Sequence, residues 1–568
     1  MQAHHKEEYE KLEIQQQQVE ELRSIKKRKK SDGHKQLRLI GTNNNQIGLN
    51  NKLDPKVQAR WDEAVVQYVT ETGTSFRSCE KFDILLKAVW PNGKPRVNVR
   101  SGQTVSKHVG KESKNLIGEV YSILSQSKEE TRGIAFTSDM WRSRALDSFM
   151  SLTAHFISKD YELVVLVPFV TWFGHNRHTG VNIKLLLDQF FKILGLDGEH
   201  IYRTVVTDNA SNNGVMFRLS RDSIQEYKCA IHTMSLCVKD VWELTILHVK
   251  IKDVLKKCSE IAVHVRRSEH NKNALKEEAK AKDVRFIMPI VPNATRWHSV
   301  EQNVQSVLHL APVIQSLAVN ESPSGSWTEL NPSAAEIKLL KSMVELLKRI
   351  KIACKIWEHD KKPTIQTMIP ELFDIQDILK KKSRDKERYV SVFARELSKL
   401  IENRFPDSGT QSLLNCVAHL LDPEYRGLIL KQYNGTYDDA RNEVIKRGMK
   451  YENVPPPPVD ESMEDDSEED VESMSAAQRL KQREMANTTR VVSAARTNGI
   501  SATESELERF EQLKIGDGSD LLKFWKENES ILPILAKVAR EIFSIPVSSA
   551  SSEREFSIGG LVSEYKKS

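Results

Sequence analysis

The feature that most limits what this chain can fold into is an apolar run in its first half that stops at an acidic residue. Ile201, Val205 and Val206 are typical of a short buried strand, and Asp208 follows them. The residues after it favour a turn: Asn209, Asn212, Asn213 and Gly214. We therefore expect Asp208 at the carboxyl end of a strand, where ligands bind in open α/β sheets.

A second acidic residue, Asp139, repeats this pattern upstream: within residues 133–141 an apolar strand is expected to end on Asp139. Between the two acids we expect strands over 149–157 and 161–172 and a helix over 180–194. The first of these strands alternates, with one apolar face made of Met150, Leu152, Ala154 and Phe156. Two antiparallel returns and a helical crossover would lay the Asp208 strand beside and parallel to the Asp139 strand. Both carboxylates would then project at the same end of the sheet.

Two carboxylates at neighbouring strand ends have two interpretations. Mg²⁺ prefers one or two carboxylates together with phosphate oxygens, so the pair suits a site for two hard cations. Alternatively, Asp139 and Asp208 each cap a turn or a helix. Strand-end position alone leaves both interpretations open.

Four blocks of sequence resemble the hAT superfamily of DNA transposases and its domesticated relatives that carry a BED finger. In order they are FTSDMW around Asp139, VVTDNASNN around Asp208, CAIH from Cys229 to His232, and IPVSSASSEREFSIGG from Ile545 to Gly560. An Arg296-Trp297 pair lies between the third and fourth blocks. The order and spacing make the set specific, and the resemblance covers roughly residues 55–565.

The resemblance implies a fold class and a chemistry. The fold would combine α/β and all-α parts: a ribonuclease-H-like catalytic core interrupted by a large α-helical insertion, with a C-terminal dimerisation motif. The chemistry would be DNA strand cleavage and strand transfer, with hairpins on the flanking DNA. Asp139 and Asp208 would bridge two Mg²⁺ or Mn²⁺ ions, and Glu553 would hold the second.

The third acid lies in a serine-rich stretch suited to a helix N-terminus. Matching the family pattern assigns the catalytic role to Glu553, with Arg554 as a phosphate-binding or structural partner. Glu555 is the competing choice, on a different helical face.

Other candidate DNA-binding residues carry alternatives. His232 has two interpretations: it lies beside the active site, where it touches phosphate or organises a carboxylate, or it lies with Cys229 in the core. No structural zinc is expected, because a closed zinc site needs four ligands. Arg296 and Trp297 open the helical insertion, and Trp297 either stacks on a base or is a buried structural residue. The basic run of Lys26, Lys27, Arg28, Lys29 and Lys30 is a nuclear-localisation or phosphate-binding patch, or a solvated charge run.

The expected organisation follows the same order. We expect a disordered tail over 1–50 and small helices for DNA contact and dimerisation over 51–130. The first part of the core is expected over 131–240, followed by a helical insertion over 241–520 that contains a disordered proline-rich and acidic loop over 453–500. C-terminal core helices with the dimerisation motif are expected over 521–568. Order should resume near Leu521.

Composition agrees with a nuclear protein that binds DNA. The net charge of +6 permits a polyanionic partner, and six cysteines without framework spacing favour a reduced compartment. No apolar run approaches bilayer length, so no membrane partner is expected. We expect double-stranded DNA and a second copy of the chain as partners.

Two further interpretations stand beside the transposase. The sequence offers no cysteine pair before a histidine pair for a BED finger, and it ends at Ser568, sooner than family members usually end. Both points favour a domesticated, catalytically inactive DNA-binding and dimerising regulator, or a truncated transposon remnant. A structure-specific nuclease is the third interpretation.

Overall fold

The computed structural model describes residues 55–72, 74–89, 97–130, 133–142, 146–174, 177–198, 202–220, 224–292, 297–321, 326–432, 435–452, 501–513 and 520–554. The chain divides into two units, 1–60 and 61–568, and all contacts discussed below lie in the second. The predictions for Lys26 to Lys30, the loop over 453–500, Arg296, the Trp297 side chain and Glu555 therefore lie outside the described part.

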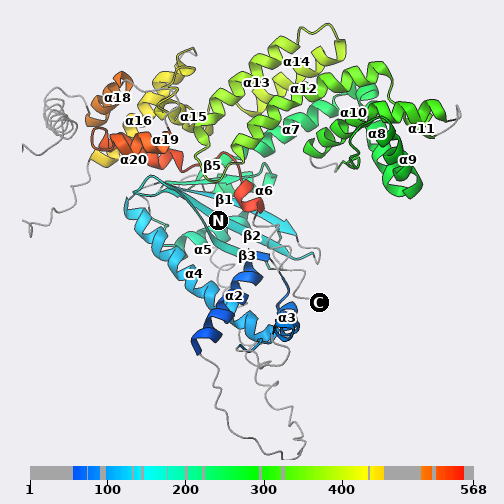
Figure 1. Cartoon of the computed structure of the whole chain (residues 1–568). Coiled ribbons are helices and arrows are strands. Elements are labelled where there is room, and N and C mark those ends of the chain that lie inside the picture. Colours follow the sequence, from blue (N-terminus) through cyan, green and yellow to red (C-terminus); the bar gives the residue numbers. More distant parts are fainter. Residues whose placement is uncertain are drawn as a thin grey trace, which may run out of the picture. The chain divides into compact units, whose positions relative to one another are not determined.

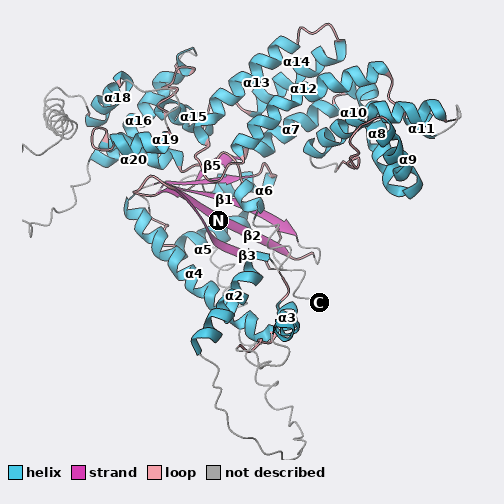
Figure 2. Cartoon of the chain, viewed as in Figure 1, coloured by secondary structure: helices cyan, strands magenta, loops and turns pink. Residues whose placement is uncertain are grey.

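Five strands form one mixed sheet in the order β3-β2-β1-β4-β5 (Figures 1 and 2). They are β1 (Gly133–Arg142), β2 (Ser148–Ile157), β3 (Leu163–Trp172), β4 (Tyr202–Thr207) and β5 (Gln225–Lys228). The first three strands are antiparallel, whereas β4 runs parallel to β1 and β5 runs parallel to β4. The predicted parallel pairing of the two acid-bearing strands is confirmed.

Three expected boundaries near the acids were wrong. Strand β1 continues past Asp139 to Arg142, because its hairpin pairing with β2 goes on after its pairing with β4 has ended at Thr137. Strand β3 begins at Leu163, since Tyr161 lies in a turn with a φ of 61°. The expected turn after Asp208 is short, because helix α6 (Ser211–Leu219) already includes Asn212 to Gly214.

The two faces of the sheet bury different cores. One face packs its apolar side chains with those of α4 (Gly102–Glu130), α5 (Gly180–Ile193) and α6. The four residues predicted to share a face of β2 all belong to this cluster, as do Ile134, Phe136 and Val205. On the opposite face, Ala135 and Val206 join a larger cluster that includes α7 (Ala230–Glu243), the helical insertion and α20 (Pro533–Phe543).

Helices fill the sequence on either side of the sheet. Before it lie α2 (Pro55–Thr72), η1 (Phe76–Lys81), α3 (Phe82–Val89) and α4. After α7 come α8 (Thr245–Arg267), α9 (Glu269–Ala281), α10 (Trp297–Asn320), α11 (Ser326–Leu330), α12 (Ala334–Trp357), η2 (Ile365–Thr367), α13 (Met368–Lys382), α14 (Arg388–Arg404), α15 (Thr410–Leu421), η3 (Leu430–Gln432), α16 (Thr436–Glu452), α18 (Ala502–Gln512) and α19 (Leu521–Asn528). Two expectations fail here: α4 is a long helix of 29 residues, and helical structure resumes at Ala502 rather than near Leu521.

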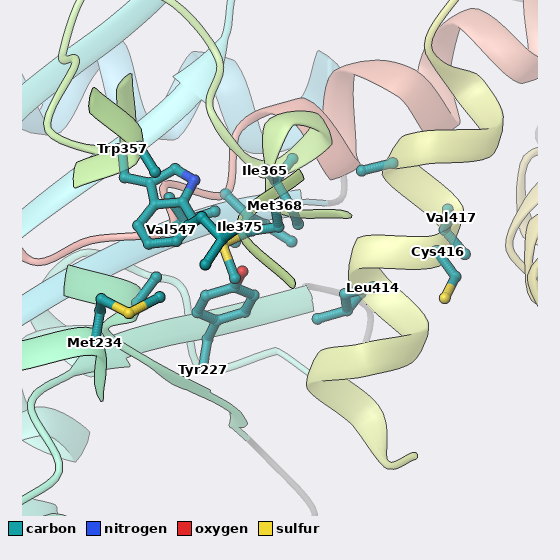
Figure 3. Packing of buried hydrophobic residues seen from close by; sticks show 14 of the residues in the cluster. Tyr227, Met234, Trp357, Ile365, Met368, Ile375, Leu414, Cys416, Val417 and Val547 are labelled. Atoms are coloured by element: carbon teal, nitrogen blue, oxygen red, sulfur yellow. The ribbon is translucent and has the colours of Figure 1, made fainter. Parts of the chain in front are cut away.

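The larger core joins segments that are far apart in the sequence. Figure 3 shows Tyr227 of β5, Met234 of α7 and Trp357 of α12 close to Val547, which follows α20. The Tyr227 hydroxyl donates to the Asn415 side chain at 2.7 Å. This packing brings the C-terminal segment to the sheet.

Close backbone approach also constrains the start of β1. A Cβ at Gly133 would lie 2.2 Å from Cγ and 2.9 Å from Cα of Glu541 in α20. Arg540, one residue earlier, donates to the Ile157 carbonyl at the end of β2 at 3.1 and 3.2 Å. Helix α20 is therefore tied to both central antiparallel strands. Across the described residues, no helix is long and apolar enough to cross a membrane.

Candidate active site

The fold places Asp139 on the face of the sheet that carries the larger core. Asp139 pairs with Ser151 of β2, and its side chain shares a face of β1 with Thr137 and Ala135. Its Oδ1 accepts a hydrogen bond of 2.7 Å from the Met140 N–H. Asp139 therefore stands within a strand and caps no helix.

Asp208 reaches the same level from the neighbouring strand. The register between β1 and β4 pairs Thr137 with Val206, so continuing it by two residues sets Asp139 beside Asp208. The Asp208 Oδ1 accepts hydrogen bonds from the Ala210 N–H at 3.0 Å and from the Asn213 side chain at 2.6 Å. Asp208 thus stabilises the turn before α6, as one of our two interpretations proposed, while its position at the strand end suits the other.

A row of hydroxyl groups fixes the third acid. The Thr137 Oγ1 lies 2.7 Å from the Ser552 Oγ, and the Thr153 Oγ1 lies 3.3 Å from the same atom. One residue earlier, the Ser551 Oγ lies 3.3 Å from the His155 Nε2. Residues 550–554 are helical, as the serine-rich start predicted, and Glu553 comes directly after this anchored pair of serines.

Cys229 joins the third sequence block to the fourth. Its sulfur accepts hydrogen bonds of 3.5 Å from the His232 N–H and the Ser549 N–H, and the Ala230 N–H donates to the Val547 carbonyl at 2.8 Å. Burial raises the pKa of the Cys229 thiol. A buried thiol that caps α7 and holds the C-terminal segment has a structural role. His232 lies partly buried in the first turn of α7, and its predicted contact with phosphate stays a prediction.

The three acids influence one another. Burial is the largest cause that raises the pKa of Asp139 to about 7, and the negative charges of Asp208 and Glu553 raise it further, against the Met140 hydrogen bond. Like charges raise the pKa of a carboxyl group only over short range. Asp208 and Glu553 therefore lie near enough to Asp139 to raise its pKa, although the three residues are separated by up to 414 positions in the sequence.

The surroundings of these acids suit a hydrated cation. The Ser151 Oγ, on the strand partner of Asp139, and the Asn209 Oδ1, next to Asp208, are buried with no hydrogen-bond partner among the described residues. No group of three or more His, Cys, Asp or Glu side chains in the described part is close enough to hold a metal ion. Mg²⁺ usually keeps several waters and takes only one or two carboxylates, so the donor set fits this ion.

Two family comparisons cover these acids. Residues 137–235 match the ZBED1 RNase-like domain, and residues 502–568 match the hAT family C-terminal dimerisation region. The first match contains Asp139 and Asp208, and the second contains Glu553.

Whole-chain comparisons agree. A putative AC transposase of Zea mays is 22% identical over 509 residues, which cover 83% of this chain and 58% of that protein. A putative AC9 transposase of Zea mays is 21% identical over 533 residues, with 83% and 59% covered. Together these matches support similarity to the hAT-superfamily transposases and their relatives. It spans less than two thirds of the length of these maize proteins. A putative transcriptional regulator tpeD of Talaromyces stipitatus is 25% identical over 169 residues, 29% of this chain and 19% of that protein.

Beside Glu553, Arg554 has structural contacts. Its guanidinium donates to the Glu358 carbonyl at 3.2 Å and pairs with Asp360 at 3.2 Å. Both side chains of the ion pair are nearly half exposed, so Arg554 is also accessible to a phosphate. The structure thus supports the structural role and leaves the phosphate-binding role a prediction.

Sequence reasoning missed the polar residues that lie around the candidate acids. Thr137, Thr153, His155 and Ser151 all project from the β1–β2 hairpin toward the site and are buried. The signal was present, because Ser151, Thr153 and His155 alternate with the apolar residues of β2. A strand with small polar groups on its second face indicates that something polar packs there.

Proposed function

We propose that the chain carries out the phosphodiester chemistry of a DNA transposase, with Asp139, Asp208 and Glu553 as its acidic triad. The observation that carries this proposal is the electrostatic interaction of three carboxylates from β1, the end of β4 and the C-terminal helical turn. Like charges that lie near one another repel, so a site that brings half-buried Asp139 and Asp208 and exposed Glu553 together is suited to binding cations.

The chain's own residues position these groups. The paired hydroxyls of Thr137, Thr153 and Ser552 hold the helical turn of Glu553 against the sheet. The Asn213 amide orients the Asp208 carboxylate, and Asn209 donates to the Thr233 hydroxyl at 2.9 Å, which leaves its carbonyl oxygen for a water or a ligand. Asp139 and Asp208 would hold two Mg²⁺ or Mn²⁺ ions, with Glu553 on the second. When bound, such ions supply an activated water or 3′-hydroxyl and stabilise the leaving oxygen.

The fold and partners belong to the same proposal. The sheet order and the match to an RNase-like domain support a ribonuclease-H-like core that the α8–α16 helices interrupt. The match to a dimerisation region supports a homo-oligomer formed through residues 502–568. The maize relatives are named transposases, and from this we propose double-stranded DNA as substrate and the nucleus as location.

The test is a cleavage assay. The purified chain is incubated with Mg²⁺ and DNA that carries the sequences flanking its own gene, and strand breaks are mapped on sequencing gels. We expect nicks that require Mg²⁺ and disappear in EDTA. If intact protein that binds this DNA leaves it uncut with both Mg²⁺ and Mn²⁺, the proposal fails.

A second candidate has its own observation. One relative is named a transcriptional regulator, and the described residues lack a preformed group of three metal-binding side chains. A non-catalytic, dimerising DNA-binding protein would keep the same fold. It would bind the DNA of the cleavage assay without cutting it.

A further inference from the structure

Three aromatic side chains form a row across the antiparallel strands. Trp141 of β1 pairs with Phe149 of β2, and Phe149 pairs with Trp172 of β3. The Trp141 and Phe149 rings stack, with centroids 5.1 Å apart and planes 22° apart. Partners in an antiparallel pair project on the same face, so all three rings lie on one side of the sheet.

This side is the one that bears the carboxylate site. Trp141 follows Asp139 by two residues on β1, so both side chains project on the same face, about 6.7 Å apart along the strand. On the neighbouring strands, Ser151 and Val170 are paired at the level of Asp139. The aromatic row therefore begins one step beyond the acids, at the end of β1.

The row is open to solvent toward the edge of the sheet. Trp172 is 47% exposed and Val170 is 48% exposed, whereas Thr137, Ser151 and Thr153 on the same face are buried. Strand β3 is the outer strand of the sheet. An exposed tryptophan next to an exposed valine on an edge strand is costly unless a ligand uses it.

The charge around the row favours a polyanion. Asp139 is the only acidic residue in β1, β2 and β3. Arg142, next to Trp141, is exposed. Burial and then the charge of Arg142 lower the pKa of His178, so this ring lies near Arg142 and adds no charge of its own at neutral pH. His178 in turn packs edge-on against Phe173, which follows Trp172. Asp147, just before β2, and Asp139 are the acids near Arg142 in the sequence.

We propose that Trp141, Phe149 and Trp172 form a stacking surface for the unpaired bases of a DNA strand that leaves the carboxylate site. Aromatic rings accept any base through its π-face, while nearby cations follow the phosphates. Arg142 supplies such a cation here. The proposal rests on the proposed function for the choice of DNA, and it adds a binding surface that reaches the edge strand.

The test measures binding without chemistry. The full chain is titrated in EDTA against a fluorescein-labelled oligothymidylate of about 12 nucleotides and against a duplex of equal length, with fluorescence anisotropy as the readout. Trp172→Leu keeps an apolar side chain but removes the ring, whereas Trp172→Phe keeps a ring. Phe373→Ala, at an equally exposed aromatic residue of α13, is the matched control.

We expect Trp172→Leu to weaken binding of the single strand by about 5- to 150-fold, the range that one stacked base contributes. Trp172→Phe should stay within about threefold of the parent, and Phe373→Ala should not change binding. The duplex should be bound equally by all four proteins. Melting temperatures establish that each variant is folded, because Trp172 is nearly half exposed.

Three results would overturn the proposal: unchanged single-strand binding by Trp172→Leu, an equal loss for single strand and duplex, or a change in dimer dissociation by sedimentation with unchanged DNA binding. The last would identify a protein interface. The binding test and the cleavage assay can fail independently. If binding depends on the Trp172 ring but the protein cleaves no DNA, only the proposed function is refuted. Cleavage by a chain whose binding ignores the ring would refute the stacking surface alone.

Discussion

The two faces of the central sheet are made by the same strands but differ in what they bury. Toward α5 and α6, the face is apolar: Phe136 packs edge-on against Phe191 with ring centroids 5.0 Å apart. Toward α20, the same strand presents Thr137 and Asp139, and β2 presents Ser151, Thr153 and His155. Adjacent residues of one strand thus serve stability on one side and chemistry on the other.

The difference teaches how the site is kept together. The apolar face tolerates any side chains that fill its volume, whereas the polar face needs partners at hydrogen-bonding distance. These partners come from residues 548–552, about 400 positions away in the sequence. Substitutions on the two faces should therefore separate loss of activity from loss of stability.

The largest expected effect is on the polar face. Asp139→Asn, Asp208→Asn and Glu553→Gln should each lower Mg²⁺-dependent cleavage by at least about 10³-fold, because a group acting in the transition state is removed. DNA affinity in EDTA should stay within a few-fold, and for Asp139→Asn the free energy of unfolding should not fall, since the cost of burying this charge near two like charges is removed. Rates come from denaturing gels and stability from urea titration.

Asp160→Asn is the matched control, because Asp160 is an exposed acid at the turn between β2 and β3. It should cleave like the parent. Normal cleavage by Glu553→Gln together with loss in Glu555→Gln would assign the third acid to the other glutamate.

On the apolar face, Phe136→Ala should cost about 3–5 kcal/mol of unfolding free energy. Phe136 is fully buried, and its removal leaves a cavity beside Phe191. Urea unfolding measures the loss, and cleavage measured at a temperature where the variant is folded should remain within about tenfold of the parent. Phe136→Leu is the control and should recover most of the stability. A variant that is stable but inactive would break the distinction between the two faces.

Much of this sheet was predictable from sequence. The alternation of β2 predicted its apolar face, and the strand–helix–strand order predicted that β1 and β4 are parallel. These features depend on local periodicity and on the chirality of crossovers, which a single sequence carries. The end of β1 was wrong, because whether a strand continues past Asp139 depends on its partner β2 rather than on its own residues.

The supports of the site were not predictable in the same way. Burial of Cys229 in the core was one of the predicted alternatives, but the hydrogen bond that its sulfur accepts from the Ser549 N–H was not foreseen. The pairing of Thr137 with Ser552 likewise joins residues with no shared local pattern. Such contacts depend on tertiary packing. The family resemblance therefore predicted the four sequence blocks and their order but not the contacts between them.

A smaller effect on the polar face concerns pH. The pKa of His155 is lowered to about 3, first by burial and then by the Arg554 charge, with Asp360 acting in the opposite direction. The unfolded chain takes up this proton below about pH 6.5, whereas the folded chain does not until about pH 3. Stability that depends on neutral His155 is thus complete above pH 6.5 and is lost as the pH falls toward 3.

At pH 5 this loss amounts to at most about 2 kcal/mol. His155→Gln should be less stable than the parent at pH 7.5 but should lose less stability between pH 7.5 and 5, as measured by urea titration at each pH. His359→Gln, at an exposed histidine, is the control and should follow the parent curve. If the free energy of unfolding changes with pH in the same way for His155→Gln and the parent, the folded protein protonates His155 in this pH range.

The smallest expected effect tests the contact between the two sequence-distant halves of the site. Ser552 is fully buried, and its hydroxyl lies against both Thr137 and Thr153. Ser552→Ala should cost about 1 kcal/mol of stability, the usual contribution of one hydrogen bond, yet lower cleavage by about tenfold, because Glu553 is no longer held in place. Ser552→Thr keeps the hydroxyl, and Thr503→Ser, which shortens a buried hydroxyl residue of α18 away from the acids, controls for general loss of packing. The ratio of lost cleavage to lost stability is compared between Ser552→Ala and Thr503→Ser. If the two ratios are equal, Ser552 contributes to packing only. The polar face would then differ from the apolar face in composition but not in role.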